Sequence, residues 1–163
     1  MYLRFAKVFY FICVVLFIVA FLYIYASLPE QLSYEADGAR DQLSKGLFFS
    51  IALGLFVVLN LVTVLPAKML ENQSFPRFRR LLRVGDPFRD KMLAWIFSFC
   101  GLLNINLFIM AYYVFMINNP ERTEMGGMAA VFYLAPLLYL VWIVGLFVLL
   151  VKRFKQFQSP GLL

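Results

Sequence analysis

The sequence predicts an all-α fold, an integral membrane four-helix bundle that forms a single transmembrane domain over residues 1–163. Hydrophobic residues make up 63% of the 163 residues, charged residues only 15%, and the mean hydropathy is +0.82. Soluble domains are roughly 45–50% apolar and about 25% charged, and a compact soluble fold of this size leaves much of its surface in water. Long runs without charge and a one-sided distribution of basic residues are the other two observations.

The charge-free runs give the positions of four membrane-spanning helices. Each run lacks Asp, Glu, Lys and Arg over 22 to 29 residues, and about 20 helical residues cross the hydrocarbon core of a bilayer. Each run is therefore long enough for one crossing and too short for two. A cleaved signal peptide is the alternative for the first run, but its length and its lack of small residues at the end favour a span. The predicted spans are about 8–27, 46–66, 92–117 and 128–151.

The basic residues predict the orientation of the bundle. Twelve of the fifteen Lys and Arg residues fall in the segments 1–7, 68–91 and 152–155. Because basic loops stay in the cytoplasm, we expect both termini and the basic loop 68–91 to be cytoplasmic. The segments 28–45 and 118–127 would then close two outward hairpins. The net charge of +6 reports this topology, and no nucleic-acid partner is expected.

Local signals support the helix boundaries. Ser44 is a predicted N-cap for the second span, and Asp86 is one for the third span, with Pro87 at its first helical position. Pro136 falls within the fourth span, where it is expected to kink the helix.

Arginines and apolar residues alternate at helical spacing within the basic loop. One interpretation is a short amphipathic helix in the membrane interface, whose arginines contact anionic lipid headgroups at about 1 kcal/mol each. The alternative is an ordinary positive-inside loop without lipid specificity. The expected partners are therefore the bilayer itself and, in the first interpretation, anionic headgroups. The four arginines are Arg77, Arg79, Arg80 and Arg83, and the apolar residues are Phe75, Phe78, Leu81 and Leu82.

A few polar side chains lie within the spans, where an unpaired polar group is costly. Asn60 and Ser98 lie at similar depths on neighbouring spans, and Asn104 lies roughly 9 Å further out than Ser98. We expect Asn60 to face the bundle interior and to bond with Ser98 or Asn104 as interhelical glue. A polar path through the membrane, including Asn106, is the alternative.

Three small residues, Gly46, Ser50 and Gly54, repeat at every fourth position of the second span. Such stripes allow another backbone to approach closely. Gly46 and Asn60 lie close to four helical turns apart, so the stripe is expected on the same inward face as Asn60. The packing partner is expected within the same chain, and a separate subunit is the alternative.

The residue inventory disfavours catalysis. The sequence contains no histidine, no carboxylate within a span, no CxxC pair and no phosphate-binding loop. We therefore predict no catalytic residues, no cofactor and no metal site, and we expect that the protein is not an enzyme. Cys13 and Cys100 fall within spans and are expected to act as small apolar residues.

The segment that follows the first span resembles the same region of the bacterial SdpI-like membrane proteins. The resemblance rests on Tyr25-Ala26-Ser27-Leu28-Pro29-Glu30-Gln31-Leu32, then Gly38 and Lys45 at the entry to the next helix. It covers about 20 residues, and this sequence lacks the family's usual histidine and has a shorter loop. The resemblance implies a multi-pass protein of the bacterial inner membrane. The chain is also similar in general form to small four-helix proteins of bacterial genomes.

Two functions remain open from the sequence. The first is a non-enzymatic membrane protein that works by contact, as a subunit, an assembly factor or an immunity-type protector of a larger membrane system. Its partner would be another membrane protein or a second copy of the chain. The second is a small transporter or channel with a polar path near Asn60, Asn104 and Asn106.

Overall fold

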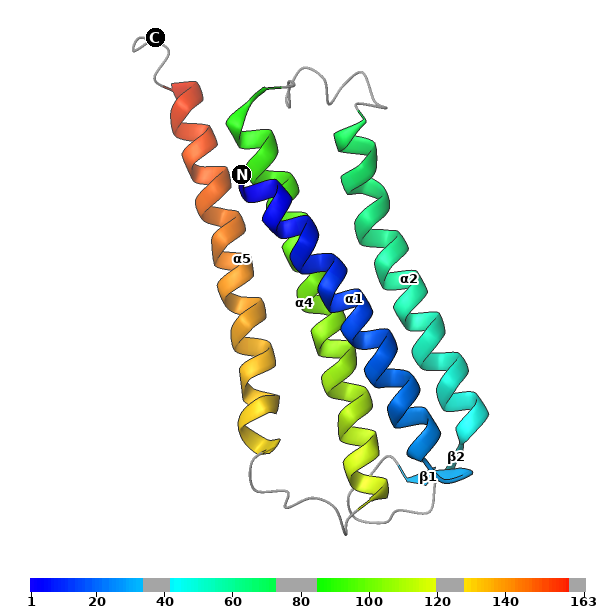
Figure 1. Ribbon diagram of the computed structural model, residues 1–163. Helices are drawn as coiled ribbons and strands as arrows, with labels where there is room; N and C mark the ends of the chain where they lie inside the picture. The colour runs from blue at the N-terminus through cyan, green and yellow to red at the C-terminus, as the bar shows by residue number, and fades with distance from the viewer. Residues whose placement is uncertain (34–41, 73–84, 120–127, 159–163) are drawn as a thin grey trace.

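The computed structural model describes residues 1–33, 42–72, 85–119 and 128–158. Within these ranges the chain forms four long helices and one short antiparallel hairpin (Figure 1). The all-helical prediction is therefore confirmed, and each of the four helices is long and apolar enough to cross a membrane. The helices are α1 (Tyr2–Ser27), α2 (Lys45–Glu71), α4 (Pro87–Asn118) and α5 (Met128–Gln158), and the strands are β1 (Gln31–Ser33) and β2 (Gln42–Ser44).

The helices extend beyond the charge-free runs. α2 continues through Pro66 to Glu71, and α4 begins at Pro87, so both ends of the segment predicted as the loop 68–91 are helical. The physical reason is that loss of charge marks the hydrocarbon region, whereas a helix can continue into the more polar interface. The predicted caps are present: the Ser44 hydroxyl accepts from the Leu47 amide, and the Asp86 carboxylate accepts from the Phe88 amide.

α4 is the central helix of the bundle, because it packs against α1, α2 and α5. Figure 1 shows α5 on the side of α4 away from α2, with the N-terminus of α1 and the C-terminal end of α5 at the same end of the bundle. The β1–β2 hairpin lies at the opposite end. We call these the terminal end and the hairpin end.

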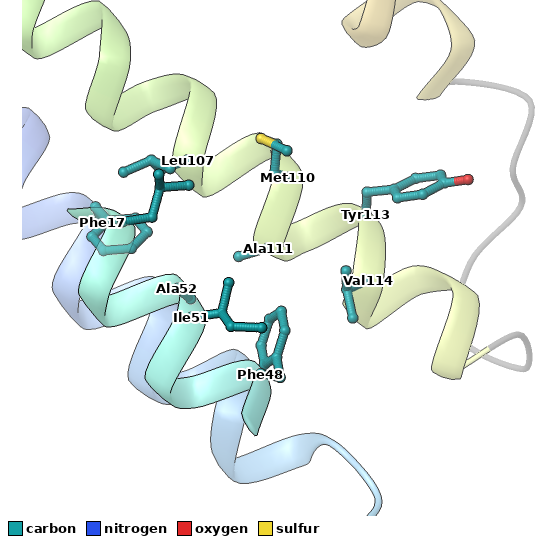
Figure 2. Close-up of a pocket in the computed structure, with 10 residues that line it drawn as sticks. Phe17, Phe48, Ile51, Ala52, Leu107, Met110, Ala111, Tyr113 and Val114 are labelled. Carbon is teal, nitrogen blue, oxygen red and sulfur yellow. The ribbon is translucent and has the colours of Figure 1, made fainter. Parts of the chain in front are cut away.

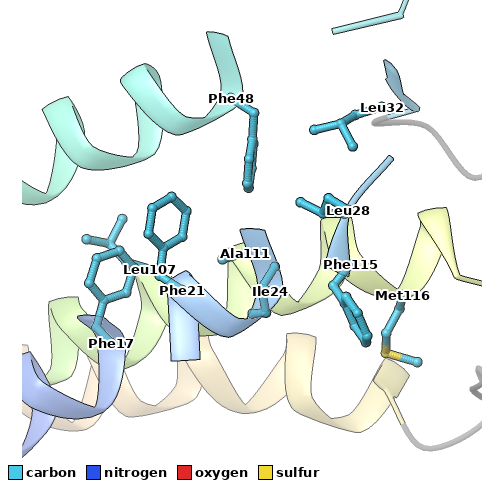
Figure 3. Close-up of a cluster of buried hydrophobic side chains, with 10 residues drawn as sticks. All are labelled: Phe17, Phe21, Ile24, Leu28, Leu32, Phe48, Leu107, Ala111, Phe115 and Met116. Atoms are coloured by element: carbon cyan, nitrogen blue, oxygen red, sulfur yellow. The ribbon is translucent and has the colours of Figure 1, made fainter. Parts of the chain in front are cut away.

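The interior contains two apolar clusters. The larger one lies toward the hairpin end and joins side chains of α1, α2, α4 and β1 (Figure 3). Aromatic rings contribute strongly: the Phe17 ring stacks on Phe56 with 4.8 Å between centroids, and Phe21 stacks on Phe49 at 5.7 Å. The smaller cluster lies toward the terminal end and consists of Ala6, Ala67, Leu93 and Phe97.

The hairpin closes one end of the larger cluster. Leu32 of β1 pairs with Leu43 of β2, and its side chain is fully buried among the helices. The Asn118 side chain at the end of α4 fixes this strand, because it accepts from the Ser33 amide at 2.9 Å and donates to the Ser33 carbonyl at 2.8 Å. The segment after α1 is therefore a packed part of the fold up to Ser33.

The outer surface of the bundle is strongly apolar. Long aliphatic and aromatic side chains of α1, α2 and α5 are more than one-third exposed over most of their length. A soluble monomer rarely exposes a continuous apolar surface of this kind, whereas lipid covers such a surface in a membrane protein. The exposed surface therefore agrees with a multi-pass membrane protein.

Candidate functional site

Three polar side chains from three helices meet in the middle of the bundle. Tyr10 of α1 donates from its hydroxyl to the Asn60 Oδ1 atom of α2 at 3.0 Å. Asn60 donates from Nδ2 to the Asn104 Oδ1 atom of α4 at 3.0 Å, and Asn104 donates back to Asn60 Oδ1 at 3.1 Å. We call Tyr10, Asn60 and Asn104 the amide cluster.

Every amide hydrogen of this cluster has an acceptor. The second Nδ2 hydrogen of Asn60 bonds to the Phe56 carbonyl, and that of Asn104 bonds to the Cys100 carbonyl, each at 2.8 Å. Asn104 is only 1% exposed. A neutral and fully paired cluster of this kind holds helices together and leaves no free donor for a substrate.

The structure therefore selects Asn104 as the partner of Asn60. Asn60 faces the interior as predicted. Ser98, the other candidate partner, lies on a different face of α4 and accepts at 3.1 Å from the Trp142 indole of α5. Asn106 joins neither group, and its described contact is the Met110 sulfur at 3.9 Å.

Tryptophans make the contact between α4 and α5, which the sequence did not reveal. The Trp95 indole donates to the Trp142 carbonyl at 2.9 Å, while the Trp142 indole donates to Ser98. Arg153 adds an ion pair with Asp86 at 2.6 Å near the terminal end. Asp86 thus caps α4 and also binds α5. A tryptophan near a helix end is typical of the membrane interface, so its spacing alone did not indicate this role.

The small-residue stripe of α2 does not pack within the described chain, so the expectation of a packing partner in the same chain was wrong. Gly46, Ser50 and Gly54 are all exposed, and a Cβ added to either glycine would meet no described atom within 4 Å. Each four-residue step turns the face by about 40°, so Gly54 lies about 120° around the helix from Asn60. The inward face is instead set by Phe48 and the buried Ala67.

Gly101 of α4 makes the close contact that the stripe was expected to make. A Cβ at this position would lie 2.6 Å from the Phe9 Cε1 atom and 3.4 Å from the Cys13 Sγ atom. Both neighbours belong to α1, so the missing side chain lets α1 approach α4. A single glycine without a repeat gave no pattern that sequence reasoning could use.

Charged side chains link three helices at the terminal end of the bundle. Lys7 of α1 forms an ion pair with Glu71 of α2, and Lys68 reaches the same carboxylate at 3.2 Å. Arg89 of α4 is 8% exposed and donates to the Glu71 carbonyl at 2.7 Å. Its Nε atom is buried without a hydrogen-bond partner among the described residues. Sequence reasoning assigned these charges to loops and missed their mutual contacts.

At the hairpin end, Lys45 is held by the segment that follows α1. Its ammonium donates to the Leu28 carbonyl at 2.7 Å and lies 5.0 Å from the centre of the Tyr25 ring. Lys45 therefore lies beside Tyr25 and Leu28, two of the other residues that carry the SdpI-like resemblance, while Gly38 lies outside the described residues. This proximity follows from the chain path and does not test the resemblance.

Some predictions fall outside the part of the chain that the structure describes. These include the proposed headgroup contacts Arg77, Arg79, Arg80 and Arg83 and the amphipathic pattern around them. Within the described ranges, no group of three or more Cys, Asp or Glu side chains is placed to hold a metal ion. Cys13 and Cys100 are both buried, and neither forms a disulfide within the described ranges.

Comparison with known proteins gives no relative from which a function can be transferred. No family model matches the chain, and no similar curated protein or solved structure was found. The SdpI-like resemblance therefore stays a prediction, and the functional argument rests on the geometry of this chain.

Proposed function

We propose that this chain is a non-enzymatic protein of the bacterial inner membrane that acts through helix and loop contacts. It would serve as a subunit, an assembly factor or an immunity-type protector of a larger membrane system. The observation that supports this proposal most directly is the closed amide cluster, because the polar groups within it bond to one another and to backbone carbonyls. Its functional surface is then the exterior of the helices and the short hairpin.

The transporter alternative needs water to reach the same amides. Asn104 is nearly fully buried, and Asn106 lies apart from the Asn60–Asn104 pair. These residues therefore do not form a continuous polar row among the described side chains. We regard interhelical glue as the better-supported role for Asn60 and Asn104.

Purification of the tagged chain from its native membrane in mild detergent tests the proposal. We expect a stoichiometric membrane partner, which can be a second copy of the chain. As a second arm, Asn104→Cys in a Cys13→Ala/Cys100→Ala background should resist water-soluble maleimides from both faces. A monomer whose introduced cysteine reacts readily would favour the transporter and contradict the contact function.

We also propose that both termini are cytoplasmic, with the hairpin end outside. The distribution of basic residues supports this orientation, since twelve of fifteen fall in the segments 1–7, 68–91 and 152–155. Reporter fusions after Leu163 and within the loop at Asp37 should report opposite sides of the membrane. If both fusions reported the same side, the four-span topology would be wrong, and the first helix would most simply be a signal sequence and not a span.

A further inference from the structure

A groove of about 330 Å³ lies between α2 and α4, toward the hairpin end of the bundle (Figure 2). Phe48 and Ala52 of α2 form one wall, Ala111 and Val114 of α4 form the other, and Phe17 of α1 also lines it. The one polar side-chain atom among the lining residues is the Tyr113 hydroxyl. The groove is therefore suited to hydrocarbon and offers little to a polar ligand.

Residue size explains why this space is left open. Ala52 and Ala111 are small and both line the groove, whereas the larger Phe48 and Phe17 rings belong to the buried cluster around it. The small side chains leave the middle of the groove unfilled. An unfilled apolar space loses the dispersion contacts that an inserted chain would restore.

The volume restricts what can occupy the groove. A water molecule takes about 30 Å³ in the liquid, so a space of about 330 Å³ is large enough for several methylene groups of a hydrocarbon chain. A helix with side chains is about 10–12 Å wide, and one 5.4 Å turn of it fills roughly 500 Å³. A hydrocarbon chain can therefore lie within the groove, whereas a helix of a partner protein could insert only side chains into it.

A fixed positive charge lies at the hairpin end of α2, on the residue that begins this helix. Lys45 is one helical turn from Phe48 along α2 and marks the end of the charge-free run 46–67. The Leu28 carbonyl and the Tyr25 ring hold its ammonium in place. An ammonium has three N–H donors, so Lys45 can also donate to a phosphate at this level.

We propose that the groove binds one acyl chain of a phospholipid, with the phosphate directed toward Lys45. The lipid would come from the leaflet at the hairpin end and enter sideways. Ile51 and Met110 line the groove and are each 54% exposed, so the groove is open to the surrounding hydrocarbon. The bound lipid would replace a direct contact between α2 and α4 along this stretch.

Photolabelling in vesicles of phosphatidylethanolamine and phosphatidylglycerol tests the proposal. The probe is phosphatidylglycerol with a diazirine in the middle of one acyl chain. Ile51 and Leu55 line the groove, whereas Leu53 and Val57 lie on the opposite side of α2 at similar depth. Ile51 and Leu55 are 54% and 41% exposed, and Leu53 and Val57 are 40% and 45% exposed. If exposure to lipid alone decided the labelling, the two sides would therefore be labelled to a similar extent. We expect about fivefold more adduct on Ile51 and Leu55, equivalent to about 1 kcal/mol. Equal labelling of the two sides would overturn the proposal.

Variants separate the groove from the general lipid surface. Ala52→Phe fills the groove and should lower labelling of Ile51 and Leu55 to the level of Leu53 and Val57. Gly54→Phe adds the same ring on the exposed side and should leave the pattern unchanged. Unchanged labelling in Ala52→Phe contradicts binding in the groove. If Ala52→Phe does not fold, Ala52→Leu fills part of the groove with a smaller side chain and should lower the labelling in the same direction, and the labelling of the unaltered chain still decides the question.

A diacylglycerol that carries the same diazirine tests the phosphate contact. We expect its labelling of Ile51 and Leu55 to be about threefold lower than that of the phospholipid probe, equivalent to about 0.6 kcal/mol. The difference should disappear in Lys45→Met. Equal labelling by both probes in the unaltered chain would overturn the assignment of a phospholipid.

Discussion

Replacing Gly101 with leucine is expected to weaken the bundle by about 1–3 kcal/mol, because the new side chain overpacks the contact between α4 and α1. Its Cβ alone would lie 2.6 Å from the Phe9 ring and 3.4 Å from the Cys13 sulfur. Rotation of Phe9 toward lipid can relieve the first clash, but the rest of the leucine side chain still extends into α1. Thermal unfolding in detergent or bicelles measures the loss.

Gly54→Leu is the matched control for this change. Both glycines lie within helices, so both variants gain similar helix propensity. Gly54 is exposed, with no described atom near its added Cβ, so this substitution should not destabilise the bundle and can gain up to about 1 kcal/mol from helix propensity. Phe9→Ala should restore part of the stability lost in Gly101→Leu, because it makes room beside the new side chain. Equal effects at the two glycines, or no rescue by Phe9→Ala, would contradict the assigned contact.

Asn104→Leu is expected to destabilise the protein by about 1–2 kcal/mol, since it leaves the Asn60 amide without its partner in the middle of the membrane. In a Tyr10→Phe background, the double variant Asn60→Leu/Asn104→Leu should lose less stability than the sum of the two single losses. Removing both members of a hydrogen-bonded pair leaves no unpaired amide. The same unfolding assay gives the coupling free energy from a double-mutant cycle.

Asn106→Leu supplies the control for an amide at nearly the same depth. The Asn106 side chain contacts the Met110 sulfur at 3.9 Å and forms no bond with the Asn60–Asn104 pair. Its removal should therefore leave stability within about 0.5 kcal/mol of the unaltered chain. A loss at Asn106 as large as that at Asn104, or strictly additive effects in the cycle, would show that the amide cluster is not a coupled unit.

The sequence by itself determined the number and positions of the described helices and the residues that begin two of them. Long charge-free runs mark where a chain can lie in hydrocarbon, and every backbone group there must be paired within a helix. Ser44 and Asp86 cap their helices through neighbours two or three residues away. Such signals act within one segment of the chain, so they can be identified without the positions of the other helices.

Only the tertiary structure decided which faces meet. A stripe repeated every four residues turns by about 40° at each step, so Gly54 lies about 120° from Asn60 and the stripe as a whole does not share the inward face that Asn60 marks. That face follows from Phe48 and Phe56, which pack on rings of α1. Contacts with other helices give three further residues their roles, namely Gly101, Trp142 and Arg153. Each membrane helix is apolar on all sides, so its sequence contains no periodic pattern that would identify these residues.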